Sequence, residues 1–428
     1  MSVMTTESTQ VVDKSPIPFT RYDAGWVILC IGMAIGGGIV FLPVQIGLKG
    51  LWVFLLSLAL AYPALYMLQE LYLKTLSKSE QCDDYTGVIT HYLGSNWGFL
   101  LSVAYFLMLL KGMLTYSLAV TFDSASYLQS YGVSSENLAS APWYALLVLI
   151  VLVAIAAQGE KVLFKISGPM VAVKLLIVVI LGFVMIPKWT ISNIGILPDI
   201  STLIRDAILT LPFTLFSILF VQILSPMNIA YRKREADSRV ATFKAIRANR
   251  IAYVILAVTV IFFALSFTFA LTHEQAVEAA KNNISALAIA SKVLPGRVVA
   301  TMSIMLNIFA IVTAFFGIYL GFQEALKGMA LNVMGRFMNV DAVSPRFITL
   351  GVAVFIIALL WCWVMTKFSI LLLQQIGAPV YGVVSCLIPC YLVFKVPVLR
   401  VYKSWKIYYI GLFGVMLCIA PFLKLLEK

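Results

Sequence analysis

The stretch Ile35-Gly36-Gly37-Gly38-Ile39 interrupts an apolar run over residues 24–48, and Pro43 follows within the same run. Each glycine lowers helix propensity by about 1 kcal/mol relative to alanine, so three in succession predict a broken helix. Broken backbone is tolerated in a bilayer only where it is buried in protein or lines a cavity. The sequence therefore predicts a membrane helix whose interruption faces a cavity.

The rest of the chain has the composition of a helical membrane protein. Of its 428 residues, 61% are hydrophobic and 12% are charged, whereas soluble globular proteins have roughly 45–50% apolar and about 25% charged residues. Apolar stretches of about 18 residues or more recur along the chain, without the alternation typical of outer-membrane barrels. This composition excludes an ordinary soluble enzyme, a disordered chain and a nucleic-acid-binding protein.

We predict an all-α polytopic membrane protein with eleven transmembrane helices. The expected spans are residues 24–48, 51–73, 97–120, 143–157, 166–187, 208–230, 250–272, 298–326, 347–366, 370–394 and 405–425. Residues 1–23 form an expected N-terminal segment. Residues 1–20 lack the apolar core of a secretory signal, so the first span is expected to be retained.

The Lys and Arg residues predict the orientation, because loops rich in them stay on the cytoplasmic side. With the N-terminus inside, 20 of the 31 Lys and Arg residues fall in inside segments and nine in outside segments. The loop 231–249 alone contains six of them. The net charge of +12 is therefore attributed to topology. The N-terminus is expected in the cytoplasm and the C-terminus on the periplasmic side.

A second interruption is predicted in the sixth span, at Pro212 and at Ser225-Pro226-Met227-Asn228. Proline removes an amide donor and clashes with the carbonyl one turn earlier. The two interrupted spans lie five apart and run in opposite directions, as in secondary transporters built from inverted repeats. We therefore expect one five-helix repeat at 24–187, a second at 188–394, and an accessory eleventh helix within 395–428.

The interrupted first span is the expected site for a substrate head group. Freed amide groups suit a carboxylate, and freed carbonyl groups suit an ammonium. An α-amino acid has both groups, so the backbone of Ile35, Gly36, Gly37 and Gly38 is predicted to bind it. The alternative interpretation is a packing or hinge site of small residues.

Two later spans supply candidate side chains for the substrate. In span 6, Thr210, Thr214, Ser217, Ser225 and Asn228 share one helix face, and Gln222 lies off that face. In span 8 a stripe of small residues predicts tight packing, flanked by residues that could shape a pocket. The candidate ligands are Ser217, Gln222, Ser225, Asn228, Thr313 and Phe316. The alternative for each hydroxyl is a hydrogen bond to its own helix backbone.

Lys111 and Lys174 are the two basic residues inside predicted spans. A charge at mid-bilayer costs about 2.5–3.5 kcal/mol, so it usually faces a cavity or a partner. Lys174 lies in the middle of its span and is the candidate for proton coupling, because a lysine there could take up and release a proton. Snorkelling of the long side chain is the alternative for both, and it is the preferred interpretation for Lys111.

The remaining polar residues give no sign of a metal site or of an enzyme. His91 and His273 fall in loops, and the six cysteines follow no metal spacing. An intramembrane enzyme would need clustered nucleophiles or ligands, and the spans offer none. Asp123, at the outer end of span 3, is predicted to cap a helix rather than to act as a gate.

Several stretches resemble the bacterial hydroxy/aromatic amino acid permeases. The first is Met33-Ala34-Ile35-Gly36-Gly37-Gly38-Ile39-Val40-Phe41-Leu42-Pro43. Three others are similar to the serine and threonine permeases of that family. They are Phe316-Gly317-Ile318-Tyr319-Leu320-Gly321-Phe322-Gln323-Glu324, Asn283-Ile284-Ser285, and Ile376-Gly377-Ala378-Pro379 followed by Lys395-Val396-Pro397.

This resemblance implies an eleven-span carrier of the bacterial inner membrane, in the amino acid–polyamine–organocation superfamily, with proton-coupled uptake. It also implies that unwound stretches of spans 1 and 6 hold the substrate and that spans 3, 8 and 10 complete the pocket. Some proton-coupled relatives place a lysine in span 5 where sodium-coupled ones bind the ion, and Lys174 fits that pattern.

The chain departs from the serine-permease pattern near the expected site. That pattern has a Phe-Ser-x-Asn-His-Ser-Pro run, whereas here Phe216-Ser217 is separated from Ser225-Pro226 and the Asn-His pair is absent. Ile318 stands where the pattern has a histidine. An apolar replacement at such positions favours a larger side chain, including an aromatic one.

The sequence thus predicts an importer of an amino acid by proton symport and alternating access, with serine or threonine preferred. The first alternative is an aromatic amino acid permease whose pocket includes Phe316 and Tyr319. A distant alternative is an ion channel, which would need a continuous polar pore lining. The expected partners are a small-molecule amino acid and the lipid bilayer, without nucleic acid. No cofactor is expected beyond the proton gradient, and sodium coupling and the oligomeric state are left open.

Overall fold

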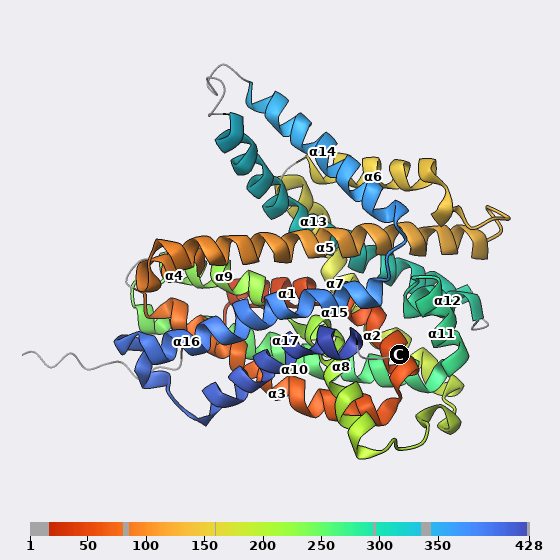
Figure 1. Cartoon of the computed structure of the whole chain (residues 1–428), viewed down its shortest axis with the longest axis horizontal. Coiled ribbons are helices and arrows are strands. Elements are labelled where there is room, and N and C mark those ends of the chain that lie inside the picture. Colours follow the sequence, from red (N-terminus) through yellow and green to blue (C-terminus); the bar gives the residue numbers. More distant parts are fainter. Residues whose placement is uncertain (1–16, 80–84, 159, 294–296, 335–343, 426–428) are drawn as a thin grey trace, which may run out of the picture.

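The computed structural model describes residues 17–79, 85–158, 160–293, 297–334 and 344–425, and its regular elements there are all helical (Figure 1). The α-helices are α1 (Arg21–Ala34), α2 (Gly37–Lys49), α3 (Leu51–Ser77), α4 (Tyr85–Leu93), α5 (Ser95–Ser130), α6 (Pro142–Ala156), α7 (Glu160–Met185), α8 (Ile200–Ile218), α9 (Val221–Arg234), α10 (Ser238–Ala270), α11 (His273–Lys281), α12 (Ala286–Val293), α13 (Arg297–Met334), α14 (Pro345–Met365), α15 (Ile370–Tyr381), α16 (Ile388–Lys395) and α17 (Trp405–Leu425). The short helices are η1 (Leu138–Ser140), η2 (Ile186–Lys188), η3 (Ile191–Ile194), the π-helical η5 (Gly382–Leu387) and η6 (Pro397–Tyr402).

Local sequence signals set where several helices begin. Thr20 and Asp23 form a capping box at the start of α1, and Pro142 begins α6. The Asp199 carboxylate accepts a hydrogen bond from the Thr202 amide and so caps α8. Hydrogen bonds from Ser201 and Thr202 hold the pKa of Asp199 below its usual range. Gly50 turns the chain from α2 into α3 with a φ of 92°, which favours glycine.

The described helices are long and apolar enough for nine membrane spans, and for ten if the bent pair α1 and α2 counts as one. The α1 and α2 axes differ by 45°. The predicted fourth span corresponds to α6, which begins at Pro142 as expected but has only 15 residues. A helix that crosses the hydrocarbon core usually needs about 20 residues. The predicted total of eleven spans is reached only if α6 also crosses the membrane, so this total stays a prediction.

The two predicted helix interruptions had different outcomes. The first is confirmed, because α1 ends at Ala34 and α2 begins at Gly37. The predicted position of the second was wrong: Pro212 lies inside α8, and Ser225-Pro226-Met227-Asn228 lies inside α9. The helix breaks instead at Leu219, whose backbone is extended, and at Phe220, which leads into α9.

The short elements that were not predicted include α4, α11, α12 and η5, and the first three of these lie at the ends of the bundle. Figure 1 shows α4, α9 and α16 at one end of the molecule, and α11 with α12 at the opposite end. The residues of α12 from Ala286 to Ala290 are fully buried, so this segment is part of the core rather than a surface loop. The fourth element, η5, lies within the tenth predicted span and adds a π-helical turn there.

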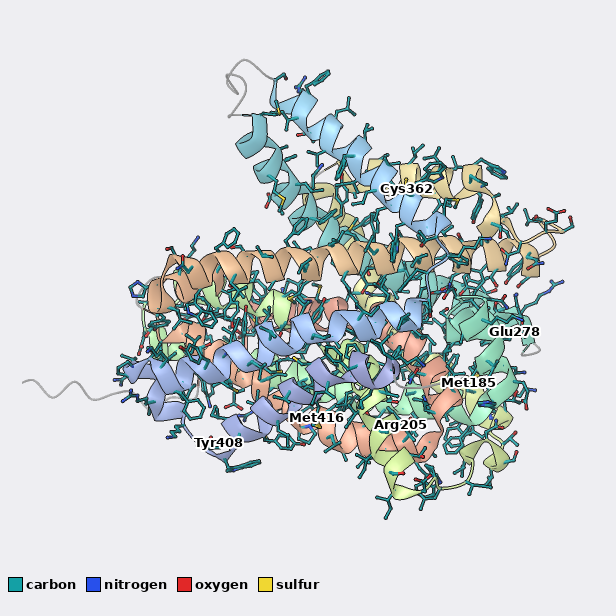
Figure 2. All side chains as sticks on the ribbon, in the orientation of Figure 1. Met185, Arg205, Glu278, Cys362, Tyr408 and Met416 are labelled. Atoms are coloured by element: carbon teal, nitrogen blue, oxygen red, sulfur yellow. The ribbon has the colours of Figure 1, made fainter. Side chains whose placement is uncertain are left out.

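The helix α5 crosses the molecule and divides the bundle. In Figure 1, α6 and α14 lie together on one side of α5, and most other helices gather on the opposite side. Side chains fill the space between the helices (Figure 2), and Cys362, which is labelled there on α14, is exposed. Cys30, Cys386 and Cys390 are buried, as small apolar side chains usually are.

Candidate functional site

A cavity lies where the two helix interruptions meet the middle of the bundle. Its walls come from α1, α2, α5, α8, α9, α13 and α15 and from Leu219 between α8 and α9. The polar side chains that line it are Lys111, Thr115, Tyr116, Gln222, Gln374 and Tyr381. Of the predicted ligands, Gly38 and Gln222 line this cavity.

The glycines of the first interruption let three segments of the chain approach one another closely. The Gly37 amide donates to the Tyr116 hydroxyl at 3.4 Å. A Cβ at Gly38 would lie 1.9 Å from the carbonyl oxygen of Phe216, and this is a backbone atom that cannot swing away. Gly38 therefore fixes the first interruption directly against the last turn of α8, next to the second interruption.

The Lys174 side chain donates hydrogen bonds to the backbone at the end of α1, beside the first interruption. Its Nζ donates to the carbonyl oxygens of Gly32 at 3.1 Å and Ile35 at 2.8 Å, and to the Thr313 hydroxyl at 2.8 Å. The side chain is completely buried on α7. One ammonium thus joins the fifth, first and eighth predicted spans and occupies two carbonyls that the interruption frees.

Lys111 lies in the wall of the cavity rather than at an interface. Its Nζ donates to Oε1 of Gln374 and stands 3.5 Å from the centre of the Phe216 ring. The Tyr381 ring centre is 5.7 Å away. The methylene groups of Lys111 pack on Gly377, where a Cβ would meet them at 2.8 Å. The snorkelling interpretation of Lys111 is therefore replaced by a position inside the site.

The other predicted ligands lie outside this cavity. Ser217 donates to the Thr214 carbonyl at 2.8 Å, and Asn228 accepts from Ser77 at 3.1 Å. Ser225 is buried, and its hydroxyl has no hydrogen-bond partner among the described residues. Thr313 accepts from Lys174, and Phe316 lines a separate hollow beside it. Thr210, Thr214 and Ser217 of the span-6 stripe thus donate to carbonyls of their own helix, as the alternative interpretation expected.

Most residues of the cavity wall were not among the predicted ligands, and these include Tyr116, Gln374, Tyr381 and Ile318. The α5 residues at the cavity, Lys111, Gly112, Thr115 and Tyr116, repeat with one-turn spacing. A polar stripe around Lys111 in an apolar span was the signal that could have identified them. Gln374 and Tyr381, two turns apart on α15, form a similar stripe.

Asp123 confirms its predicted role as a cap. Its carboxylate accepts from the Ser285 amide at 2.9 Å and from the Asn307 side chain at 2.6 Å. Ser285 immediately precedes α12, and its hydroxyl accepts from the Ala288 amide at 3.2 Å. The buried carboxylate therefore connects α5 and α13 to the start of α12.

The cavity offers hydrogen-bond donors and acceptors of several kinds. Within the described ranges, no group of three or more His, Cys, Asp or Glu side chains could hold a metal. The cavity combines backbone groups at two helix interruptions, the Lys111 ammonium, and amide and hydroxyl side chains, and Lys174 binds the Ile35 carbonyl beside it. Such a set offers donors and acceptors to a ligand with separated charges.

Comparison with known proteins agrees with this architecture. The chain is 50% identical over 413 residues to a serine transporter of Escherichia coli O157:H7, covering 96% of this chain and 93% of the relative. It is 27% identical to the serine transporter SdaC of Escherichia coli K12 and 25% identical to the threonine/serine transporter TdcC of Yersinia enterocolitica, each over 94% of both chains. No family model matches the chain.

Among solved structures, MhsT in complex with L-phenylalanine is similar in fold, with a TM-score of 0.52 and 15% identity over 94% of this chain and 98% of that one. Together with the apolar helices, these likenesses define a multi-pass membrane protein of the transporter class. The chain belongs to the hydroxy/aromatic amino acid permease family, as its motifs implied, and its relatives are named as transporters rather than enzymes.

Proposed function

We propose that this chain imports a small amino acid, with serine or threonine preferred, by proton symport and alternating access. The named substrates of three relatives support the choice of amino acid. The observation that carries the proposal is the contact of Lys174 with the Gly32 and Ile35 carbonyls beside the interruption. A proton carried by this amine would act directly on the segment that binds the substrate.

The substrate head group binds at the first interruption. The Gly38 amide in the first turn of α2 and the Tyr116 hydroxyl receive the carboxylate, since a helix N-terminus favours an anion. The Gly37 amide donates to Tyr116 and the Gly36 amide to the Ala34 carbonyl. Two carbonyls of α1 are bound by Lys174, so the ammonium group takes its acceptors from the end of α8 and from Gln222. Oε1 of Gln222 is buried and has no hydrogen-bond partner among the described residues.

The eleven-span plan with inverted repeats belongs to the same proposal. The repeats at 24–187 and 188–394 each contain one interrupted helix, and Gly38 packs against the backbone of Phe216 where the two meet. The helix α17, within the accessory segment 395–428, packs outside this pair against α15 and η5. In this plan the N-terminus is cytoplasmic and the C-terminus periplasmic.

Uptake of labelled serine into proteoliposomes, under separately imposed proton and sodium gradients, tests the proposal. The proton gradient should drive accumulation. Lys174→Gln should reduce that accumulation by about tenfold or more, within the usual range of coupling between two sites, while serine exchange at equal pH continues. Lys292→Gln, on the exposed side of α12, is the matched control. Accumulation driven by sodium alone, or unchanged in Lys174→Gln, would contradict proton coupling.

An aromatic substrate is the second candidate. The rings of Phe216 and Tyr381 meet edge to face at 4.7 Å in the cavity wall, and Ile318 adds an apolar surface. Phe316 lies outside this cavity, so the aromatic pocket would differ from the one expected from the sequence. Competition of unlabelled serine, threonine, tryptophan and tyrosine with labelled serine separates the two candidates.

A further inference from the structure

Lys111 has an environment that the proposed transport cycle does not use. It lies one helical turn and one residue before Tyr116 on α5, and both side chains line the central cavity. Five residues of α-helix span about 7.5 Å, and side chains on a helix lean toward its N-terminus. The backbones of Lys111 and Tyr116 are therefore about 7.5 Å apart along the cavity wall, and we call these two positions its ends.

The charge of Lys111 has no opposite charge beside it. No carboxylate of the described residues lies within salt-bridge distance of its Nζ. Its contacts are Oε1 of Gln374 and the face of the Phe216 ring. An aromatic face stabilises an ammonium without neutralising it. An ammonium has three N–H donors and no acceptor, so this group can still donate into the cavity.

The two ends of the cavity differ in what they offer a ligand. The end at Tyr116 presents the Gly38 backbone and a hydroxyl, which accepts from the Gly37 amide and keeps its own proton to donate to a head group. The end at Lys111 presents an amine, an amide side chain and two rings. If the head group occupies the first end, as the proposed function has it, then the side chain of the substrate faces Lys111.

We propose that Lys111 determines the side-chain specificity of this site. Its ammonium donates a hydrogen bond to an oxygen on the substrate side chain, and its charge excludes a side chain that carries a second positive charge. Serine and threonine offer that oxygen, whereas alanine does not. The analogue 2,3-diaminopropionate places an ammonium where serine has its hydroxyl, at almost the same size.

The experiment is competition of serine, alanine and 2,3-diaminopropionate against labelled serine on the purified full-length protein, in mildly acidic buffer where both amines of the analogue are protonated. A hydrogen bond from a charged donor predicts that the wild type binds serine roughly 10- to 100-fold more tightly than alanine. The analogue should compete more weakly than alanine. Wild-type protein that binds the analogue as well as serine overturns the proposal without any variant.

Lys111→Met keeps the length of the side chain and its packing on Gly377 but removes the charge. It should weaken serine binding, bring the ratio of alanine to serine affinity close to one, and admit the analogue. Lys281→Met, exposed on α11, is the control and should match the wild type. An unchanged ratio in Lys111→Met, or an equal loss for all three ligands in a protein of unchanged melting temperature, overturns the assignment. Failure of the proposed function is distinct, because the wild type would then bind none of the three.

Discussion

At the scale of single residues, Gly38 carries the closest contact between the two interrupted helices. The backbone carbonyl of Phe216 occupies the space where a side chain would begin. A Cβ at Gly37 would lie 2.8 Å from the Tyr116 ring, which is a side chain and not backbone. Of the three glycines, Gly38 therefore tolerates a side chain least. Its backbone packs against the backbone of α8, and it also forms part of the cavity wall.

Gly38→Ala should destabilise the protein and abolish serine binding, because α2 and α8 must separate to admit the methyl group. Overpacking of this kind costs about 1–3 kcal/mol. The melting temperature in detergent and the affinity for labelled serine measure the two effects. Gly328→Ala on α13 has nothing within 4 Å of its new Cβ and serves as control. A Gly38→Ala protein that melts and binds like Gly328→Ala would contradict this reading.

The two membrane lysines illustrate what could be predicted from the sequence at this scale. Lys174 was identified because it lies in mid-span, and its bonds to Gly32 and Ile35 fit that expectation of a buried partner. Lys111 was assigned to the interface, since a long side chain can reach water from many positions. Only the packing of α15 against α5 reveals that Gln374 and Gly377 hold it inside.

At the scale of elements, the helix interruptions show where proline and glycine patterns mislead. Three glycines predicted the first interruption correctly. In the sixth span the prolines lie inside helices, and the break falls at Leu219 and Phe220, which have no breaking tendency of their own. The contact of Phe216 with Gly38 lies one turn before this break. Tertiary packing of that kind is not visible in the sequence of one span.

The short helix α12 depends on a carboxylate from another helix. Asp123→Ala should leave the buried Ser285 amide without its acceptor, at a cost of about 1–3 kcal/mol, whereas the Asn307 side chain keeps the Tyr127 and Ser285 hydroxyls as acceptors. The expected result is a lower melting temperature and faster amide hydrogen exchange at the start of α12. Glu278→Ala, exposed on α11 and labelled in Figure 2, should change neither. Unaltered exchange in Asp123→Ala would show that α12 is held by its apolar contacts alone.

At the scale of the whole molecule, the two ends of the bundle should face opposite sides of the membrane. Figure 1 places α11 and α12 at one end and α9 at the other. The basic loop between α9 and α10 should be cytoplasmic by the positive-inside rule. This loop and α11 are therefore the positions that best report the orientation.

In a cysteine-free background, Glu278→Cys on α11 should react with a membrane-impermeant maleimide in intact spheroplasts. Ala236→Cys, exposed between α9 and α10, should react only after the membrane is permeabilised. Both residues are exposed, so a difference in labelling reports sidedness rather than burial. The opposite pattern would reverse the orientation and, with it, the direction assigned to uptake.

The peptide plane between Ile35 and Gly36 has one consequence for the molecule as a whole. Its carbonyl oxygen is bound by Lys174, and the glycine on its other side begins the turn that leads into α2. A substrate that tilts this peptide plane changes how tightly the Ile35 carbonyl binds the Lys174 ammonium. Linkage between two bound species is reciprocal, so the Lys174 ammonium changes the affinity for the substrate by the same factor. A single rigid amide can then couple the two.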